Sequence, residues 1–204
     1  MHPIRLIASA AILLLLGACA APVPVLLGDT SRTLMAPGEG LVAGSVSFKT
    51  VEPDFKRFGL IYTASYVPAN QAKGLFTDYA FSIGNKGVEA RGLDKARGPN
   101  ETAPIVMLMP VKAGKYKVAR IGVLGAESTS FFPKNPRVVE VIAGQVTYVG
   151  ADVIEYSTSY KGLGVLTPNV KTPLTRNDFE RDMADLKAMD NRLESIPATN
   201  ALIQ

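Results

Sequence analysis

Apolar and polar residues alternate along much of the central part of the chain. Val42, Val46 and Phe48 stand at even positions between small or polar residues at odd ones. This period of two is typical of a β-strand with one buried face. Similar β-rich runs follow, at 58–66, 75–83, 105–111, 116–124, 137–142 and 145–156.

Turn-forming residues separate these runs. Glycine, proline and asparagine gather at 84–87, 113–114, 133–136 and 143–144. Short strands punctuated in this way predict a mainly β fold, an antiparallel β-sandwich of about seven strands, and not the strand–helix alternation of a parallel sheet. The sandwich domain is expected to cover residues 39–156.

Two segments give a more detailed expectation. Gly114 precedes the strand-like Tyr116-Lys117-Val118, and Ala143-Gly144 divides 138–150 into two β-rich halves. The second pattern predicts a hairpin. The side chains expected in the core or at its edge are Tyr116, Val118, Val141, Val146 and Tyr148.

These segments carry a family resemblance. The pairing of 114–118 with 141–150 resembles bacterial lipoproteins that contain a transthyretin-like or carboxypeptidase-regulatory-like β-sandwich. The resemblance covers roughly residues 40–156 and rests on turn glycines and core aromatics. It implies a fold, and it brings no catalytic residues with it.

Residues 84–103 form the least regular part of the expected domain. A long unstructured loop is uncommon in a compact domain and is often functional. The alternative is a hairpin tip with a short extra pair of strands around 88–93.

Beyond the sandwich, residues 157–176 are expected to form a loop-like linker, and 177–196 an amphipathic helix. Asn177 and Glu180 have the spacing of a capping box, and Pro197 marks the end. An apolar stripe at helical spacing must pack either on its own domain or on a partner, and it is a possible interaction surface. The stripe consists of Phe179, Met183, Leu186 and Leu193.

The N-terminus has the parts of a signal peptide, predicted over residues 1–18. Arg5 gives a basic head, 6–16 is apolar except for Ser9, and small residues follow. The apolar run is shorter than the ~20 residues that span a bilayer. Pro22 and Pro24 oppose its extension as a helix.

Residues 16–19, Leu-Gly-Ala-Cys, resemble the lipobox of bacterial lipoproteins. The resemblance implies that Cys19 is lipidated and that 19–38 tethers the domain to the membrane. In a Gram-negative host, Ala20 after the cysteine implies sorting to the outer membrane, facing the periplasm. The expected partners are the membrane, through this lipid, and an envelope protein.

Composition removes several classes of chemistry. His2 leaves with the signal peptide, and Cys19 is the only cysteine. Histidine-based triads, cysteine nucleophiles and histidine-bearing zinc sites are therefore excluded. Ser-x-x-Lys, phosphate-loop and calcium-loop motifs do not occur. No catalytic, cofactor-binding or metal-ligating residue is predicted.

Two kinds of residue pair keep alternatives open. Carboxylates from distant strands can converge for hydrolysis, and the available sets are Glu52 with Asp54, Asp152 with Glu155, and Asp94 with Glu101. Tyrosines four apart in a strand can form a binding platform or cover the edge of the core, and these pairs are Tyr62 with Tyr66 and Tyr156 with Tyr160.

Charge adds one exclusion. The formal net charge is +4, and the basic residues are scattered along the chain. A nucleic-acid-binding protein would show a basic stripe with interleaved aromatics. The sequence therefore predicts a lipid-anchored, non-enzymatic binding or structural module of the cell envelope. The alternative is an envelope hydrolase that uses converging carboxylates.

Overall fold

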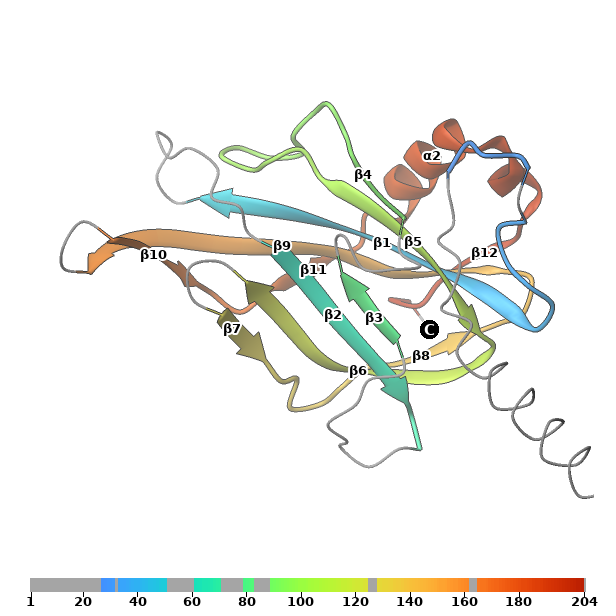
Figure 1. The fold of residues 1–204 in the computed structure, drawn as a ribbon, viewed down its shortest axis with the longest axis horizontal. Helices are drawn as coiled ribbons and strands as arrows, with labels where there is room; N and C mark the ends of the chain where they lie inside the picture. Colours follow the sequence, from blue (N-terminus) through green and yellow to red (C-terminus); the bar gives the residue numbers. More distant parts are fainter. Residues whose placement is uncertain are drawn as a thin grey trace, which may run out of the picture.

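The computed structural model describes residues 27–31, 33–50, 61–70, 79–82, 89–124, 128–161 and 165–203. The predicted signal peptide and Cys19 lie outside these residues. The described part of the chain is mainly β, as the alternation predicted, and forms two sheets and a helix near the C-terminus (Figure 1).

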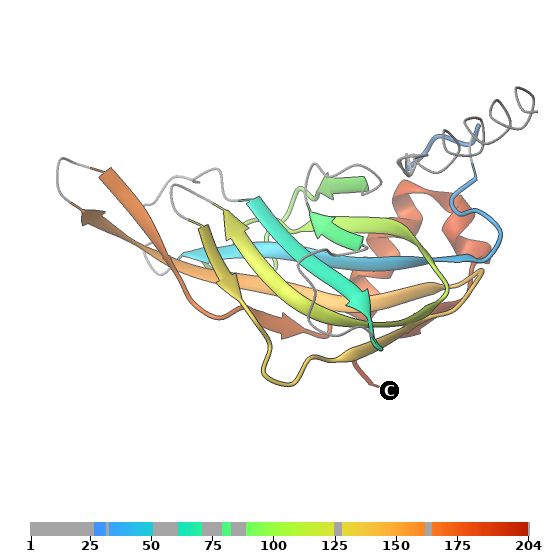
Figure 2. The same ribbon diagram turned by 60° about the horizontal axis from the view of Figure 1, so that its bottom comes forward.

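The larger sheet, sheet A, has the order β10-β9-β1-β5-β4, and β11 and β12 also pair with β9. Its strands are β1 (Glu39–Thr50), β4 (Glu89–Gly92), β5 (Ile105–Lys112), β9 (Val146–Lys161), β10 (Val165–Val170), β11 (Leu174–Arg176) and β12 (Ala198–Asn200). β1 occupies one edge of β9, while β12, β11 and β10 share the other edge in succession. The β9–β10 pair reaches beyond the rest of sheet A at one end (Figure 2).

The smaller sheet, sheet B, has the order β3-β2-β6-β7, with β8 also paired to β6. Its strands are β2 (Ile61–Pro68), β3 (Tyr79–Ser82), β6 (Gly114–Leu124), β7 (Ser128–Phe131) and β8 (Val138–Val141). All of its described pairings are antiparallel. Alternate residues of β1, β5 and β9 pack against sheet B in one apolar core, which includes Val46, Met107 and Ile154.

Sheet A is a mixed sheet, since β1 and β12 each run parallel to β9. Parallel neighbours need a long crossover connection. Between β1 and β9 the chain passes through all the strands of sheet B, which supplies that crossover. The parallel pairings were not expected, because alternation along one strand does not reveal the direction of its neighbour.

The predicted hairpin at Ala143-Gly144 is wrong. β8 belongs to sheet B and β9 to sheet A, so the turn joins the two sheets instead of two paired neighbours. Gly144 has a φ of 75°, which suits glycine in a tight turn. The predicted burial is nevertheless confirmed, since Tyr116, Val118, Val141, Val146 and Tyr148 are all buried.

The first strand differs from the expectation of one buried face. Residues 41–48 of β1 are all buried. Their odd-numbered side chains face a second core, which includes Leu41, Leu108 and Tyr148 and lies on the side of sheet A away from sheet B. The domain therefore has three layers, with sheet A in the middle (Figure 1).

The third layer is formed by α2 (Phe179–Met189) and the 3₁₀-helix η2 (Asn191–Ser195). The helix begins later than predicted, with Asp178 at the N-cap position and no side-chain capping bond. Asn177 Oδ1 accepts hydrogen bonds from the backbone N–H of Phe179 at 3.4 Å and from Asn200 Nδ2 at 2.8 Å. The backbone leaves the α-helical path at Asp190, so the expected helix over 177–196 is two shorter ones.

Two further segments contain more strand than expected. The region 157–176, expected as a loop-like linker, includes the end of β9 and all of β10 and β11. Within 84–103, β4 pairs with β5, which agrees with the extra strand considered around 88–93. Short strands of this kind form because β5 and β9 offer unpaired edges, a long-range effect that local alternation does not show.

Candidate functional site

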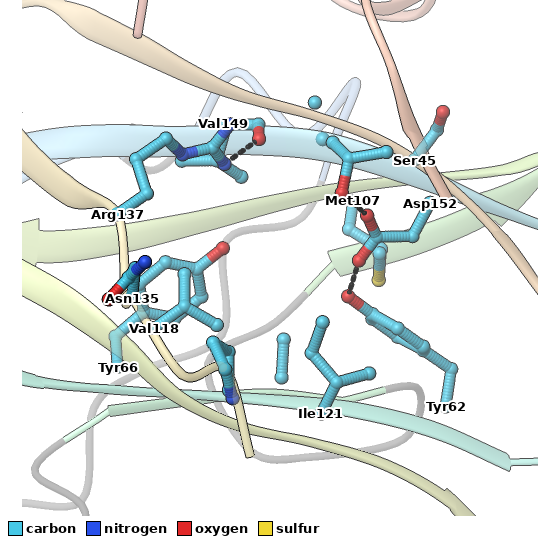
Figure 3. A pocket seen from close by; sticks show the side chains of 15 residues that line it. Ser45, Tyr62, Tyr66, Met107, Val118, Ile121, Asn135, Arg137, Val149 and Asp152 are labelled. Carbon is cyan, nitrogen blue, oxygen red and sulfur yellow. Dashed lines mark hydrogen bonds between the residues drawn. The ribbon is translucent and has the colours of Figure 1, made fainter. Parts of the chain in front are cut away.

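A cavity of about 190 Å³ lies between the two sheets. Strands β1, β5 and β9 of sheet A form one wall, and β2 and β6 of sheet B form the other. The segment between β7 and β8 contributes Asn135 and Arg137, and β11 contributes Thr175. Figure 3 shows Arg137 and Asn135 on one side and the Tyr62–Asp152 pair on the other.

Small residues and backbone irregularities keep this space open. Gly44 and Ala64 line the cavity and have little or no side chain to fill it. Opposite Gly44, the register between β1 and β9 shifts near Gly150, whose φ is 118°. A Cβ at Gly150 would clash with Thr175 Cγ2. Glycine at this position therefore lets β11 pack closely on β9 beside the cavity.

Asp152 is the acidic group of the cavity. The Tyr62 hydroxyl donates a hydrogen bond to its Oδ2, and the Thr175 hydroxyl donates to Oδ1 at 2.6 Å. Burial raises the pKa of Asp152 above its ordinary value, and these two hydrogen bonds and the charge of Arg137 only partly offset that rise. The carboxylate is thus held by two neutral donors in a largely desolvated place.

Arg137 is the basic group. Its Nη2 donates to the carbonyl oxygen of Val149 (Figure 3). Its Nε is buried and finds no hydrogen-bond partner among the described residues. Leaving a buried donor unsatisfied costs about 1–3 kcal/mol, more for a charged group. The guanidinium that lines the cavity therefore has hydrogen-bonding capacity that the described residues do not use.

Tyr62 and Tyr66 complete the polar lining. Both are buried and project from β2 into the space between the sheets. Burial and the nearby Asp152 raise the pKa of both phenols, so they are neutral at physiological pH. They were considered as an exposed platform, and the structure places them on the inside of the sandwich instead. Tyr156 is likewise buried, and the Tyr160 side chain lies outside the described residues.

A second polar cluster lies between sheet A and the helix layer. Asp182 is fully buried and accepts hydrogen bonds from Ser45 Oγ at 2.7 Å and Tyr148 OH at 2.6 Å. Arg97 pairs with the other oxygen of Asp182 and with Asp185 at 2.7 Å. The cluster joins the segment after β4 to the helix and to two strands of sheet A.

The cluster continues along the same face through Glu101. Arg176 donates to both oxygens of Glu101, at 3.0 and 2.7 Å, and Ser47 Oγ donates at 2.6 Å. Asp178 lies 3.4 Å from both Arg97 and Arg176 and connects the two groups. Burial would raise the pKa of Glu101, but the hydrogen bonds from Arg176 and Ser47 outweigh it and lower the pKa.

Sequence reasoning missed this cluster, although a signal for it exists. Asp178, Asp182 and Asp185 are spaced by four and three residues, so they share one helix face. That face borders the apolar stripe, where acidic residues are unexpected without a cationic partner.

The predicted carboxylate pairs are not brought together among the described residues. Asp152 faces the inter-sheet cavity, whereas Glu155 accepts a hydrogen bond from Lys171 on the other side of β9. Asp94 is exposed, whereas Glu101 is buried in its pair with Arg176. Glu52 and Asp54 lie outside the described residues.

The apolar stripe of the C-terminal helix packs on its own domain. Met183, Leu186 and Leu193 are buried in the core between the helix layer and sheet A. Phe179 packs edge-to-face on Tyr148, with ring centroids 5.5 Å apart. Of the two alternatives for this stripe, the structure favours internal docking. These side chains are therefore not available as a surface for a partner.

Among the residues that the structure describes, no group of three or more His, Cys, Asp or Glu residues is placed to hold a metal ion. Nor does any helix there have both the length and the apolar character needed to cross a membrane.

No protein-family model matches the chain, and no curated protein matches its sequence. Among solved structures, the chain is similar to a leucine-rich repeat protein from Bacteroides thetaiotaomicron, at 12% identity and a TM-score of 0.32. The match covers 60% of this chain, which spans 14% of the length of that one. So distant a likeness carries no argument about function.

Proposed function

We propose that the protein is a lipid-anchored, non-enzymatic binding module of the bacterial cell envelope, attached to the outer membrane and facing the periplasm. The cavity between the two sheets supports the binding role, because Arg137 lines it with a guanidinium whose Nε has no hydrogen-bond partner among the described residues. The placement of Cys19 after an apolar run supports the anchor. The resemblance to lipoproteins with a transthyretin-like sandwich points the same way.

A non-enzymatic role fits the groups that line the cavity. The Asp152 carboxylate accepts hydrogen bonds from the Tyr62 and Thr175 hydroxyls, and Arg137 lies across the cavity from this pair. Binding needs only shape and a few placed polar groups, and the cavity provides both.

The anchor is tested by labelling cells with a fatty acid and separating their membranes. The wild-type protein should carry the label and fractionate with the outer membrane, whereas Cys19→Ser should lose the label. Ala20→Asp is the matched control, which should keep the label but move to the inner membrane. Unchanged labelling of Cys19→Ser would contradict the anchor.

The binding role is tested by native mass spectrometry of the full chain extracted from membranes under mild conditions. The wild-type protein should release a small molecule on denaturation. Ala64→Leu fills the cavity with a larger side chain and should carry none, with circular dichroism confirming its fold. Equal amounts of the same molecule on both proteins would place binding elsewhere.

A further inference from the structure

The two charged side chains of the cavity between the sheets lie on opposite sides of it (Figure 3). Arg137 stands on one side, and Asp152 with its two hydroxyl donors stands on the other (Figure 3). Each carboxylate oxygen of Asp152 already accepts one hydrogen bond, from Tyr62 or from Thr175. By contrast, Arg137 keeps a buried Nε without a partner among the described residues. Of the two charged groups, the guanidinium is therefore the less satisfied one.

The size of the cavity limits what can satisfy it. A protein cavity of about 150 Å³ is large enough to hold benzene, and this one measures about 190 Å³. Its walls include the apolar side chains of Met107, Val118 and Ile121. The space therefore suits a molecule with one compact apolar part and one polar end.

We infer that the cavity binds a small organic monocarboxylate, whose carboxylate pairs with Arg137 and whose apolar part lies between Tyr62, Tyr66 and Met107. This inference rests on the proposed binding function and names its ligand class. The planar guanidinium matches the two oxygens of a carboxylate, and such charge-assisted hydrogen bonds are about twice as strong as neutral ones.

Charge argues against the other classes of small ligand. A doubly charged phosphate would meet a single cation and lie in the same cavity as the Asp152 carboxylate. A cationic ligand would be repelled by Arg137, and each oxygen of Asp152 already accepts one hydrogen bond. A neutral molecule would add no partner of opposite charge for the half-buried guanidinium of Arg137.

The test uses the full-length protein in detergent and a panel of probes, namely acetate, butyrate, hexanoate and benzoate, each paired with its primary amide. Binding is measured by calorimetry and by the shift in melting temperature. At least one carboxylate should bind, and the corresponding amide should bind at least about tenfold more weakly, because it lacks the charge that Arg137 recognises.

Three variants locate the site. Arg137→Gln should weaken carboxylate binding at least about tenfold. Lys134→Gln is the matched control, because it removes a positive charge from the same segment at an exposed position, and it should leave binding unchanged. Asp152→Asn removes the negative charge opposite Arg137 and should tighten carboxylate binding.

Each other outcome overturns the inference. If no carboxylate of the panel binds, if amides bind equally well, or if Lys134→Gln weakens binding as much as Arg137→Gln, the cavity does not select a carboxylate through Arg137. A neutral or cationic molecule released from the wild-type protein, and absent from Ala64→Leu, would overturn the ligand class while the proposed binding function stands. Water alone in the cavity of a crystal soaked with the panel would overturn the ligand class, while the proposed binding function is decided by the native mass spectrometry of the wild-type protein and Ala64→Leu.

Discussion

The hydroxyl of Tyr148, from the middle of sheet A, donates a hydrogen bond to Asp182 of the helix at 2.6 Å. Both side chains are fully buried. The Asp182 carboxylate also accepts a hydrogen bond from Ser45 and forms an ion pair with Arg97. Three parts of the chain that are far apart in sequence therefore meet at one acidic side chain. A buried charge is tolerated only when it is paired and hydrogen-bonded. The Asp182 carboxylate meets both conditions, through Arg97 and through the hydroxyls of Ser45 and Tyr148.

This relationship predicts that Asp182→Ala is strongly destabilising. The change leaves the guanidinium of Arg97 buried and removes the acceptor of two hydroxyls, so we expect a loss of about 3–5 kcal/mol in the free energy of unfolding. Urea denaturation measures it. Glu180→Ala, at an exposed position of the same helix, should cost less than about 0.5 kcal/mol.

If Asp182→Ala does not fold, the double variant Arg97→Met with Asp182→Leu keeps the prediction testable. Replacing both charges by apolar groups leaves no unpaired buried ion, so the double variant should fold and be more stable than Asp182→Ala. An Asp182→Ala protein with nearly wild-type stability would contradict the role assigned to the cluster.

Asp190, at the C-terminal end of α2, should make the free energy of unfolding depend on pH. Hydrogen bonds from Arg192, together with the backbone N–H of Gly28, lower its pKa from 3.8 to about 2, against the effect of burial. Because the folded state has the lower pKa, this contribution is present above pH 3.8 and is lost as the pH falls towards 2.

Asp190→Asn should therefore reduce the free energy of unfolding by about 2 kcal/mol at neutral pH. The difference from the wild-type protein should shrink on acidification through the same range. Urea unfolding at a series of pH values measures this. A difference independent of pH would show that the ionised carboxylate is not the stabilising form.

Val138 is the first residue of β8 and Val146 is the first residue of β9, yet they differ in burial. Val146 is 0% exposed, whereas Val138 is 53% exposed. Val146→Asp should cost at least about 3 kcal/mol, because it places an unpaired charge in a core, and Val138→Asp should be nearly neutral. Thermal melting of the two variants checks this. Similar melting temperatures would contradict the register of β8 and β9.

Gly150 and Gly144 allow two effects of glycine to be separated. Both have positive φ, but an added Cβ meets nothing within 4 Å at Gly144, whereas at Gly150 it clashes with Thr175. Gly144→Ala should cost about 1–2 kcal/mol from conformation alone. Gly150→Ala should cost more than about 2 kcal/mol. Equal losses in urea denaturation would indicate that β11 moves freely away from β9.

The sequence predicted the sandwich because its signals are local. Alternation at 42–48 and the continuous apolar run at 105–111 locate strands whatever their neighbours are. Pairing partners are not local, and for this reason the turn at Ala143-Gly144 was expected to join neighbours of one sheet. Ser45 and Ser47 were assigned to a solvent face, since only the fold reveals that Asp182 and Glu101 cover them.

The cavity was even less predictable. The spacing of Tyr62 and Tyr66 shows that they share one face of a strand, but it does not show whether that face points to the core or to solvent. Arg137 comes from the segment between β7 and β8 and Asp152 from β9, and they carry no motif in the sequence. Their proximity depends on the register shift near Gly150 and on the course of the chain between β7 and β8.

The position of β9 also determines when the domain can be completed. Val146 pairs with Leu41 on one side and with Ala198 on the other. Its two neighbours in the sheet are therefore synthesised long before it and long after it. Contacts so distant in sequence make folding slow. On the proposed route of export, in which the chain crosses a membrane from its N-terminus, sheet A cannot close until residue 200 has emerged. Until then the part of β9 that pairs with β12 exposes an unpaired edge, so we expect this protein to depend on chaperones during that export more than a domain built from local hairpins does.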